Sequence, residues 1–172
     1  ASDVDAMFVI PDDSGPDGQV AAARLVRLAC DLVGRPGPDP AMVVDADLRP
    51  EGKGGPLVRT KSSYLTYYAK WASAWEAQAL LRARPAAGAQ ELAAAVLDEL
   101  AGLRYPQAGV DATQIAEIRR LKLRMATERI PRGTDKERHL KLGPGGLSDI
   151  EWTIQLLQQQ HAGNSPALRT PS

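Results

Sequence analysis

SDVDAMFVI, at residues 2–10, is the stretch that decides the fold, because an acidic pair precedes an apolar run there. Val, Ile and Phe favour extended structure, so the run predicts a β-strand over residues 3–10. Side chains of a strand alternate between its two faces, and Asp3 and Asp5, with one residue between them, therefore point the same way. We expect this strand to aim two carboxylates at one point.

A second acidic motif, VDADLRP at residues 44–50, ends another apolar run and predicts a second strand over residues 41–48. We expect Asp45 to approach the first acidic pair from this neighbouring strand. Three converging carboxylates repel one another unless a cation lies between them, and their hard oxygen atoms suit Mg²⁺. Asp47 competes with Asp45 for this role because both share one strand face. The alternative is that the acidic pair is only a solvated turn at a strand end.

The composition excludes several classes of function. Among 172 residues, 21 are Lys or Arg and 21 are Asp or Glu, so the net charge favours neither nucleic acid nor an anionic membrane. No apolar run reaches membrane-spanning length, and no basic-then-apolar leader is present. The single Cys30 excludes an internal disulfide framework and fits a reducing, cytoplasmic compartment. Residue 1 lies directly against the acidic motif, so we expect the chain to be a piece of a longer protein.

Hydrophobic periodicity predicts an α/β unit at the start of the chain. Strand-breaking residues predict a loop over residues 11–18, and a helix is expected over residues 19–33 between the two strands. The serines at 62–63 can cap a further helix, which is expected to run to residue 84 before a proline.

This long predicted helix carries an aromatic stripe that we expect to pack in the core, formed by Tyr64, Tyr68, Trp71 and Trp75. Arg82 continues the stripe, and Arg84 follows it at the end of the helix. The two arginines are expected either to complement the negative end of the helix dipole or, if they face the carboxylates, to hold a triphosphate.

Beyond residue 85 the chain is expected to be entirely helical, with amphipathic helices over residues 89–103 and 112–130. Basic residues interspersed with acidic ones cover one face of the second helix. A solvated face is the default interpretation of this pattern, and a protein-docking face is the alternative.

A glycine-rich segment, KLGPGGLS at residues 141–148, opens the last long helix, which is predicted over residues 149–161. Glycines before a helix N-terminus can form an anion cradle. Ser148 and Glu151, however, have the spacing of a capping box, and Asp149 adds negative charge to the first turn. We therefore expect the segment to cap the helix rather than to bind phosphate.

Four motifs in the same order resemble those of glutamine synthetase adenylyltransferases: SDVD at 2–5, DADLRPEGKGGPLV at 45–58, WEAQALLRAR at 75–84 and KLGPGGLSDIE at 141–151. The resemblance covers nearly the whole chain. It implies an α+β fold with two parts. The first, residues 1–84, would be a partial polymerase beta-like nucleotidyltransferase sheet, and the second, residues 85–172, an incomplete helical domain similar to that of nitrogen-sensing uridylyltransferases.

The resemblance implies transfer of AMP from ATP to a tyrosine of glutamine synthetase, which regulates nitrogen assimilation. The implied partners are glutamine synthetase and a PII-type nitrogen signal protein, with no nucleic acid and no membrane. The implied catalytic residues and Mg²⁺ ligands are Asp3, Asp5 and Asp45, since the family motif places its acid three residues before Leu48. The implied ATP-binding residues are Ser2, Arg82 and Arg84.

Two spellings, Asp149-Ile150-Glu151 and WEAQAL, resemble the C-terminal, adenylylating half of these bifunctional enzymes. The spellings DADLRP at 45–50 and Glu151-Trp152-Thr153 resemble an actinobacterial member. Two alternatives stay open. The same carboxylates could serve phosphorolytic deadenylylation, with phosphate as acceptor, or the helices could form a non-catalytic module that docks glutamine synthetase or a PII-type protein. Ala1 stands where the family has glycine, and the glycine-rich segment expected before it is absent, which leaves open an inactive isolated chain.

Overall fold

Two compact units make up the computed structural model, which describes residues 3–38, 40–130 and 133–171. Unit 1 comprises Ala1–Ala72 and Arg84–Glu99, and unit 2 comprises Ser73–Ala83 and Leu100–Ser172. The two units therefore alternate along the sequence, whereas the sequence predicted one boundary after residue 84. The division into two functional domains at that boundary stays a prediction.

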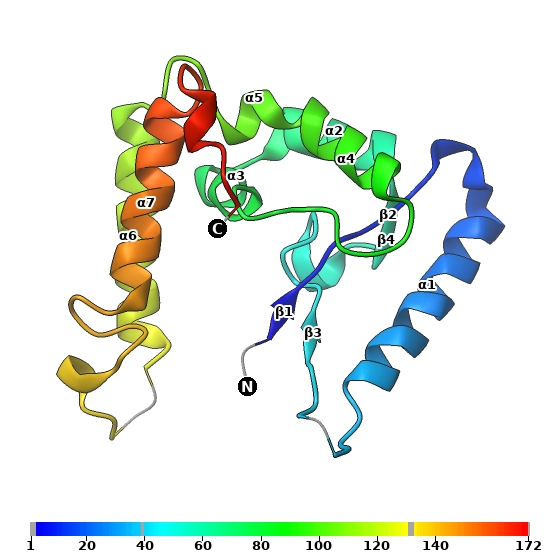
Figure 1. Ribbon diagram of the computed structural model, residues 1–172, viewed down its shortest axis with the longest axis horizontal. Helices are drawn as coiled ribbons and strands as arrows, with labels where there is room; N and C mark the ends of the chain where they lie inside the picture. The colour runs from blue at the N-terminus through cyan, green and yellow to red at the C-terminus, as the bar shows by residue number, and fades with distance from the viewer. Residues whose placement is uncertain (1–2, 39, 131–132, 172) are drawn as a thin grey trace. The chain divides into compact units, whose positions relative to one another are not determined.

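Four short strands in unit 1 form two parallel pairs, visible in Figure 1. The pairs are β1 (Val4–Asp5) with β3 (Val44–Asp45), and β2 (Phe8–Ile10) with β4 (Val58–Thr60). The strand predicted over residues 3–10 is interrupted at residues 6 and 7, because its partner changes there from β3 to β4. Only two residues of the second predicted strand are extended, those of β3. A loop follows them and leads to β4.

Helix α1 (Gly15–Val33) supplies the crossover that parallel pairing of β2 with β4 requires. It begins four residues earlier than predicted, so the predicted loop over residues 11–18 is partly helical. Pro16 is tolerated in the first turn of a helix, where amide groups lack partners, and Asp17 complements the helix dipole there. Gln19 Nε2 donates to the Val58 carbonyl oxygen at 2.8 Å and ties α1 to β4.

Apolar side chains cover two faces of α1. Ala22 and Val26 lie on the half-buried face, which belongs to a helix packed against β2 and β4. Leu25, Leu28 and Leu32 form a second apolar stripe beside that face, and each is more than half exposed. A helix that is apolar on both faces is typical of one enclosed on both sides.

The helix predicted to run from residues 62–63 to residue 84 is two helices, α2 (Lys61–Trp71) and α3 (Ala74–Leu80). Ser73 has an extended backbone between them. Its amide and its hydroxyl both donate to the Glu76 carboxylate, at 2.9 and 2.8 Å. This local cap starts a new helix, which is why one continuous periodicity was the wrong interpretation.

The N-terminus of α2 is capped by Thr60 rather than by either predicted serine, because the Thr60 hydroxyl accepts a hydrogen bond from the Ser63 amide at 3.3 Å. Tyr64 and Tyr68 are buried, as predicted, and their rings lie 6.4 Å apart. Trp71 is 71% exposed, so the aromatic stripe is core only in its first half. Helix α4 (Gln90–Glu99) packs against α2 and β2 and completes unit 1.

Unit 2 is built from helices. Helix α3 packs against α5 (Ala101–Arg104), α6 (Ala112–Glu128) and α7 (Leu147–His161). Helices α6 and α7 run antiparallel (Figure 1), since Lys122 pairs with Asp149 near one end while the Val110 amide donates to Gln160 near the other. Short 3₁₀ turns complete the described elements: η1 (Asp12–Ser14) and η2 (Gly52–Gly54) in unit 1, and η3 (Lys136–Arg138) and η4 (Pro166–Leu168) in unit 2.

Arg104 is the polar centre of unit 2 and is only 9% exposed. Its guanidinium donates to the carbonyl oxygens of Leu80, Leu81 and Ala83 at 3.0, 3.4 and 3.2 Å. These carbonyls belong to the last residue of α3 and to the turn after it, where helical hydrogen bonding stops, so a buried cation bonds to them and complements the helix dipole. The Tyr105 ring covers the guanidinium, with its centroid 5.0 Å away.

The α+β class predicted from the sequence is confirmed, with small parallel strand pairs followed by a mostly helical segment. Within the described ranges, every regular element beyond residue 85 is helical, as predicted. In those same ranges, no helix combines the length and the apolar character needed to span a membrane.

We expect Arg104→Met to lower the free energy of unfolding by about 2–3 kcal/mol, because it leaves buried carbonyls at the end of α3 without a charged donor. Thermal and urea unfolding followed by circular dichroism measures the change. Arg119→Met on the exposed face of α6 is the matched control and should change stability by less than about 0.5 kcal/mol. Equal effects of the two substitutions would contradict the role of Arg104.

Burial raises the pKa of Tyr64 from 10.0 to about 12. Because the tyrosine of the unfolded chain loses its proton first, the contribution of Tyr64 to the free energy of unfolding is complete below pH 10. It is lost as pH rises through about 12. We expect a decline of about 2–3 kcal/mol in unfolding free energy over that range, which Tyr64→Phe should abolish. Tyr67→Phe, at a half-buried position on the same helix, should leave the decline in place.

Candidate active site

Two of the three carboxylates expected to bind metal, Asp5 and Asp45, belong to strands β1 and β3, which run side by side (Figure 1). The parallel register places Asp5 directly opposite Asp45. Paired residues of neighbouring strands present their side chains on the same face of the sheet. Asp3 is exposed and lies just before β1, two residues from Asp5. The strand pairing thus brings Asp5 and Asp45 together from segments forty residues apart in sequence.

A three-ligand metal centre is not formed by the described residues: no three Asp, Glu, His or Cys side chains among them converge closely enough to hold an ion. Asp3 therefore does not complete a cluster with Asp5 and Asp45 here. The hard carboxylate oxygens of the cross-strand pair fit Mg²⁺ in chemical character. The three-carboxylate ligand set stays a prediction, and Ser2 lies outside the described residues.

Hydrogen bonding distinguishes Asp45 from its competitor Asp47. Asp45 Oδ1 accepts a hydrogen bond from the Asp47 amide at 2.7 Å, which orients the Asp45 carboxylate. The Asp47 carboxylate lies between Arg49 and Lys53, with charged atoms 3.5 and 3.3 Å away. Its charge is already balanced within its own loop, whereas Asp45 is the acid beside Asp5.

Arg49 shapes the loop that follows β3. Its Nη1 donates to the Ala46 carbonyl at 2.7 Å and its Nε to the Gly55 carbonyl at 3.2 Å, so one side chain joins both ends of the loop. A Cβ at Gly55 would lie 2.3 Å from the Pro50 carbonyl oxygen, and only glycine fits there. The glycines of this loop therefore serve its close folding around Arg49.

The two arginines predicted to bind a triphosphate lie after the end of α3 and belong to different units. Arg82 is in unit 2, and its Nη1 lies 3.0 Å from Glu151 Oε1. Arg84 is in unit 1, is exposed and makes a long 3.5 Å contact with the Pro85 carbonyl. Arg104, which the sequence motifs did not single out, donates the hydrogen bonds to the carbonyls at the C-terminal end of α3. Neither Arg82 nor Arg84 has this role. Phosphate binding by Arg82 and Arg84 stays a prediction.

The glycine-rich segment before α7 satisfies its own amide groups. Four consecutive amides donate within the protein, those of Gly145, Gly146, Leu147 and Ser148. Their acceptors, in the same order, are the Asp149 carboxylate and the carbonyls of Gly143, Leu140 and Lys141. An anion cradle needs amides that point at a ligand, so this segment is structural, as expected.

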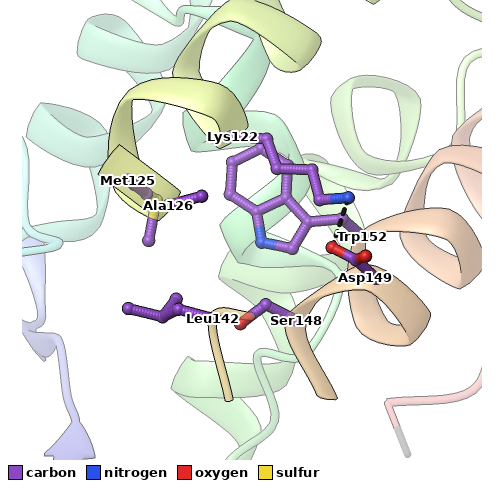
Figure 2. A pocket seen from close by; sticks show the side chains of 7 residues that line it. All are labelled: Lys122, Met125, Ala126, Leu142, Ser148, Asp149 and Trp152. Atoms are coloured by element: carbon purple, nitrogen blue, oxygen red, sulfur yellow. Dashed lines mark ion pairs between the residues drawn. The ribbon is translucent and has the colours of Figure 1, made fainter. Parts of the chain in front are cut away.

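The capping box predicted from Ser148 and Glu151 is wrong. Helix α7 begins two residues earlier than predicted, with Gly146 at its N-cap and no side-chain cap, so Ser148 lies inside the first turn. Asp149 takes the structural role instead. Its carboxylate accepts the Gly145 amide at 2.8 Å and pairs with Lys122 of α6 at 2.7 Å (Figure 2).

Figure 2 shows the small hollow between α6, α7 and the segment before α7. Its apolar lining comes from Met125, Ala126, Leu142 and Trp152. The ion pair between Lys122 and Asp149 borders the hollow beside these apolar side chains. The hollow therefore resembles a packing seam between two helices rather than a ligand pocket.

Comparisons with known proteins agree on one family. The family described as glutamate-ammonia ligase adenylyltransferase matches residues 1–99. A bifunctional glutamine synthetase adenylyltransferase/adenylyl-removing enzyme of Cutibacterium acnes is 57% identical over 172 residues, 100% of this chain. Enzymes of the same description from Mycobacterium bovis and Streptomyces avermitilis are 50% and 49% identical over 99% and 98% of the chain. The chain spans 17% to 18% of the length of these relatives.

We expect Asp149→Asn to lower the melting temperature at neutral pH, because hydrogen bonds from Lys122 and from the Gly145 amide hold the pKa of Asp149 below 3.8. That stabilisation is present above pH 3.8 and is lost as pH falls through the lower folded pKa, so the two melting curves should converge in acid. Ser148→Ala is the control and should melt like the wild type. If Ser148→Ala lowered the melting temperature more than Asp149→Asn did, Ser148 would be the cap of α7 after all.

Proposed function

The chain belongs to the glutamate-ammonia ligase adenylyltransferase family, and we propose that it forms part of a catalytic half that transfers AMP from ATP to a tyrosine of glutamine synthetase. The observation that carries this proposal is the pairing of Asp5 with Asp45 on adjacent parallel strands. The spelling Asp149-Ile150-Glu151 supports the adenylylating half by resemblance. The single Cys30 fits work in the reducing cytoplasm.

In the proposed reaction, the tyrosine hydroxyl oxygen attacks the α-phosphorus of ATP, a new P–O bond forms, and pyrophosphate leaves with the electron pair of the broken bond. Asp45 accepts the hydroxyl proton in this proposal, and the hydrogen bond from the Asp47 amide to Oδ1 orients its carboxylate. Asp3, Asp5 and Asp45 would hold Mg²⁺, which when bound supplies positive charge beside the phosphates.

Phosphate recognition in this proposal falls to Ser2, Arg82 and Arg84. A guanidinium offers several N–H donors in a plane and suits phosphate oxygens. The exposure of Arg82 and Arg84 supports this role, because neither side chain is buried in packing. Glutamine synthetase is the proposed protein substrate, and a PII-type nitrogen signal protein is the proposed regulator.

The full-length parent enzyme tests the assignment of this half. Asp5→Asn and Asp45→Asn variants are incubated with labelled ATP and glutamine synthetase, and separately with adenylylated glutamine synthetase and phosphate. Loss of AMP transfer with retained AMP removal supports the adenylylating half. Loss of removal alone would assign the phosphorolytic half, and retention of both activities would favour a docking module.

We expect Asp45→Asn to slow AMP transfer by about 100- to 1,000-fold, because it removes a negative ligand and the proposed proton acceptor without altering the size of the side chain. Asp5→Asn and Asp3→Asn should have losses of the same order. Initial rates at saturating ATP and Mg²⁺ measure the change, and melting temperatures verify that the variants fold.

Asp47→Asn is the matched control, because its carboxylate is engaged by Arg49 and Lys53 within its own loop. It should keep transfer within about threefold of the wild type while loosening a surface ion pair. A large loss from Asp47→Asn with little loss from Asp45→Asn would exchange the roles of the two acids.

A further inference from the structure

Two polar contacts, four residues apart on each side, join α3 and the turn after it to α7. Gln78 Nε2 donates to Gln155 Oε1 at 2.8 Å, and Arg82 Nη1 pairs with Glu151 Oε1 at 3.0 Å. The first contact is half-buried, since Gln78 is only 3% exposed and Gln155 is intermediate. The second lies towards solvent, with the side chains of Arg82 and Glu151 59% and 44% exposed. The two contacts thus link the motif that contains Arg82 to the motif that ends in Glu151.

We propose that Glu151 is a positioning residue, which holds the Arg82 guanidinium in the orientation that binds the phosphates of the nucleotide. This inference rests on the ATP-binding role proposed for Arg82. Glu151 contacts the arginine and not the substrate, so it acts through Arg82.

The geometry leaves the guanidinium able to do both tasks. Glu151 takes a hydrogen bond from Nη1, while a guanidinium carries five N–H donors, so other donors remain for phosphate oxygens. Arg82 lies two residues beyond the end of α3 on a turn, where its long side chain has many rotamers. An acceptor on a neighbouring helix selects one group of these rotamers before nucleotide arrives.

Holding α3 against α7 is a weaker explanation of the ion pair. Exposed ion pairs contribute little to stability, because solvent screens them and ordering two long side chains costs entropy. The half-buried contact between Gln78 and Gln155 already joins the same two helices one turn away. Removal of the Gln155 amide should therefore affect the packing of α7, and removal of the Glu151 charge should affect Arg82.

The test uses the full-length parent enzyme and the rate of AMP transfer as a function of ATP concentration. Glu151→Gln should raise the KM for ATP by about two- to fivefold, with kcat and melting temperature close to those of the wild type. Arg82→Ala should raise the KM for ATP more than Glu151→Gln does. In the Arg82→Ala background, Glu151→Gln should have no further effect, because its only route to the nucleotide is gone. Glu151→Asp, which keeps the charge, should restore part of the affinity.

Gln155→Ala is the matched control, and it should lower the melting temperature without changing the KM for ATP. If Arg82→Ala leaves the KM for ATP unchanged, the proposed role of Arg82 fails, and this inference fails with it. If Arg82→Ala weakens ATP binding and Glu151→Gln does not, only the positioning role is overturned. A lower KM in Glu151→Gln would also overturn it, since Glu151 would then compete with phosphate for Arg82.

Discussion

Parallel pairing of the first strand segment is the constraint on which unit 1 depends. Residues 4–10 pair first with β3 and then with β4, and both pairings are parallel. Parallel neighbours cannot be joined by a tight turn, so the chain needs a crossover, which α1 supplies by packing on β2 and β4. The same register sets Asp5 opposite Asp45, so the constraint that builds the unit also places its acidic pair.

Arginine side chains hold several segments in place through hydrogen bonds to backbone carbonyl oxygens. Arg49 joins the two ends of the loop after β3, and Arg104 satisfies the carbonyls that end α3. Arg169 does the same for α7 by donating to the carbonyls of Ala162 and Gly163. Arg104 and Arg169 also share the ring of Tyr105, at 5.0 and 5.5 Å from its centroid. Arg104 and Arg169 lie outside the sequence motifs, and their partners are backbone oxygens, which carry no side-chain signal in the sequence.

Two segments with one capping pattern show where local sequence stops being informative. Ser73 and Glu76 have the spacing of a capping box and use it, which divides the predicted long helix. Ser148 and Glu151 have the same spacing and do not, because the turn before Gly146 lets α7 start two residues earlier. Glu151 then faces Arg82, a residue far away in sequence. The pattern is identical, and the difference comes from which partner the fold supplies.

The sequence by itself determined the α+β class, the helical character of the described residues beyond 85 and the approximate place of most helices. Such features follow from apolar spacing and from residues that break regular structure, and both act over a few positions. Only the tertiary structure decided that Asp5 pairs with Asp45 and that Asp47 is neutralised in its loop. It also decided that Arg104 bonds to the carbonyls at the C-terminal end of α3. Each of these contacts joins an element to a partner whose position depends on the path of the chain between them. Local propensity carries no information about that path, because register and packing are set only when distant segments meet.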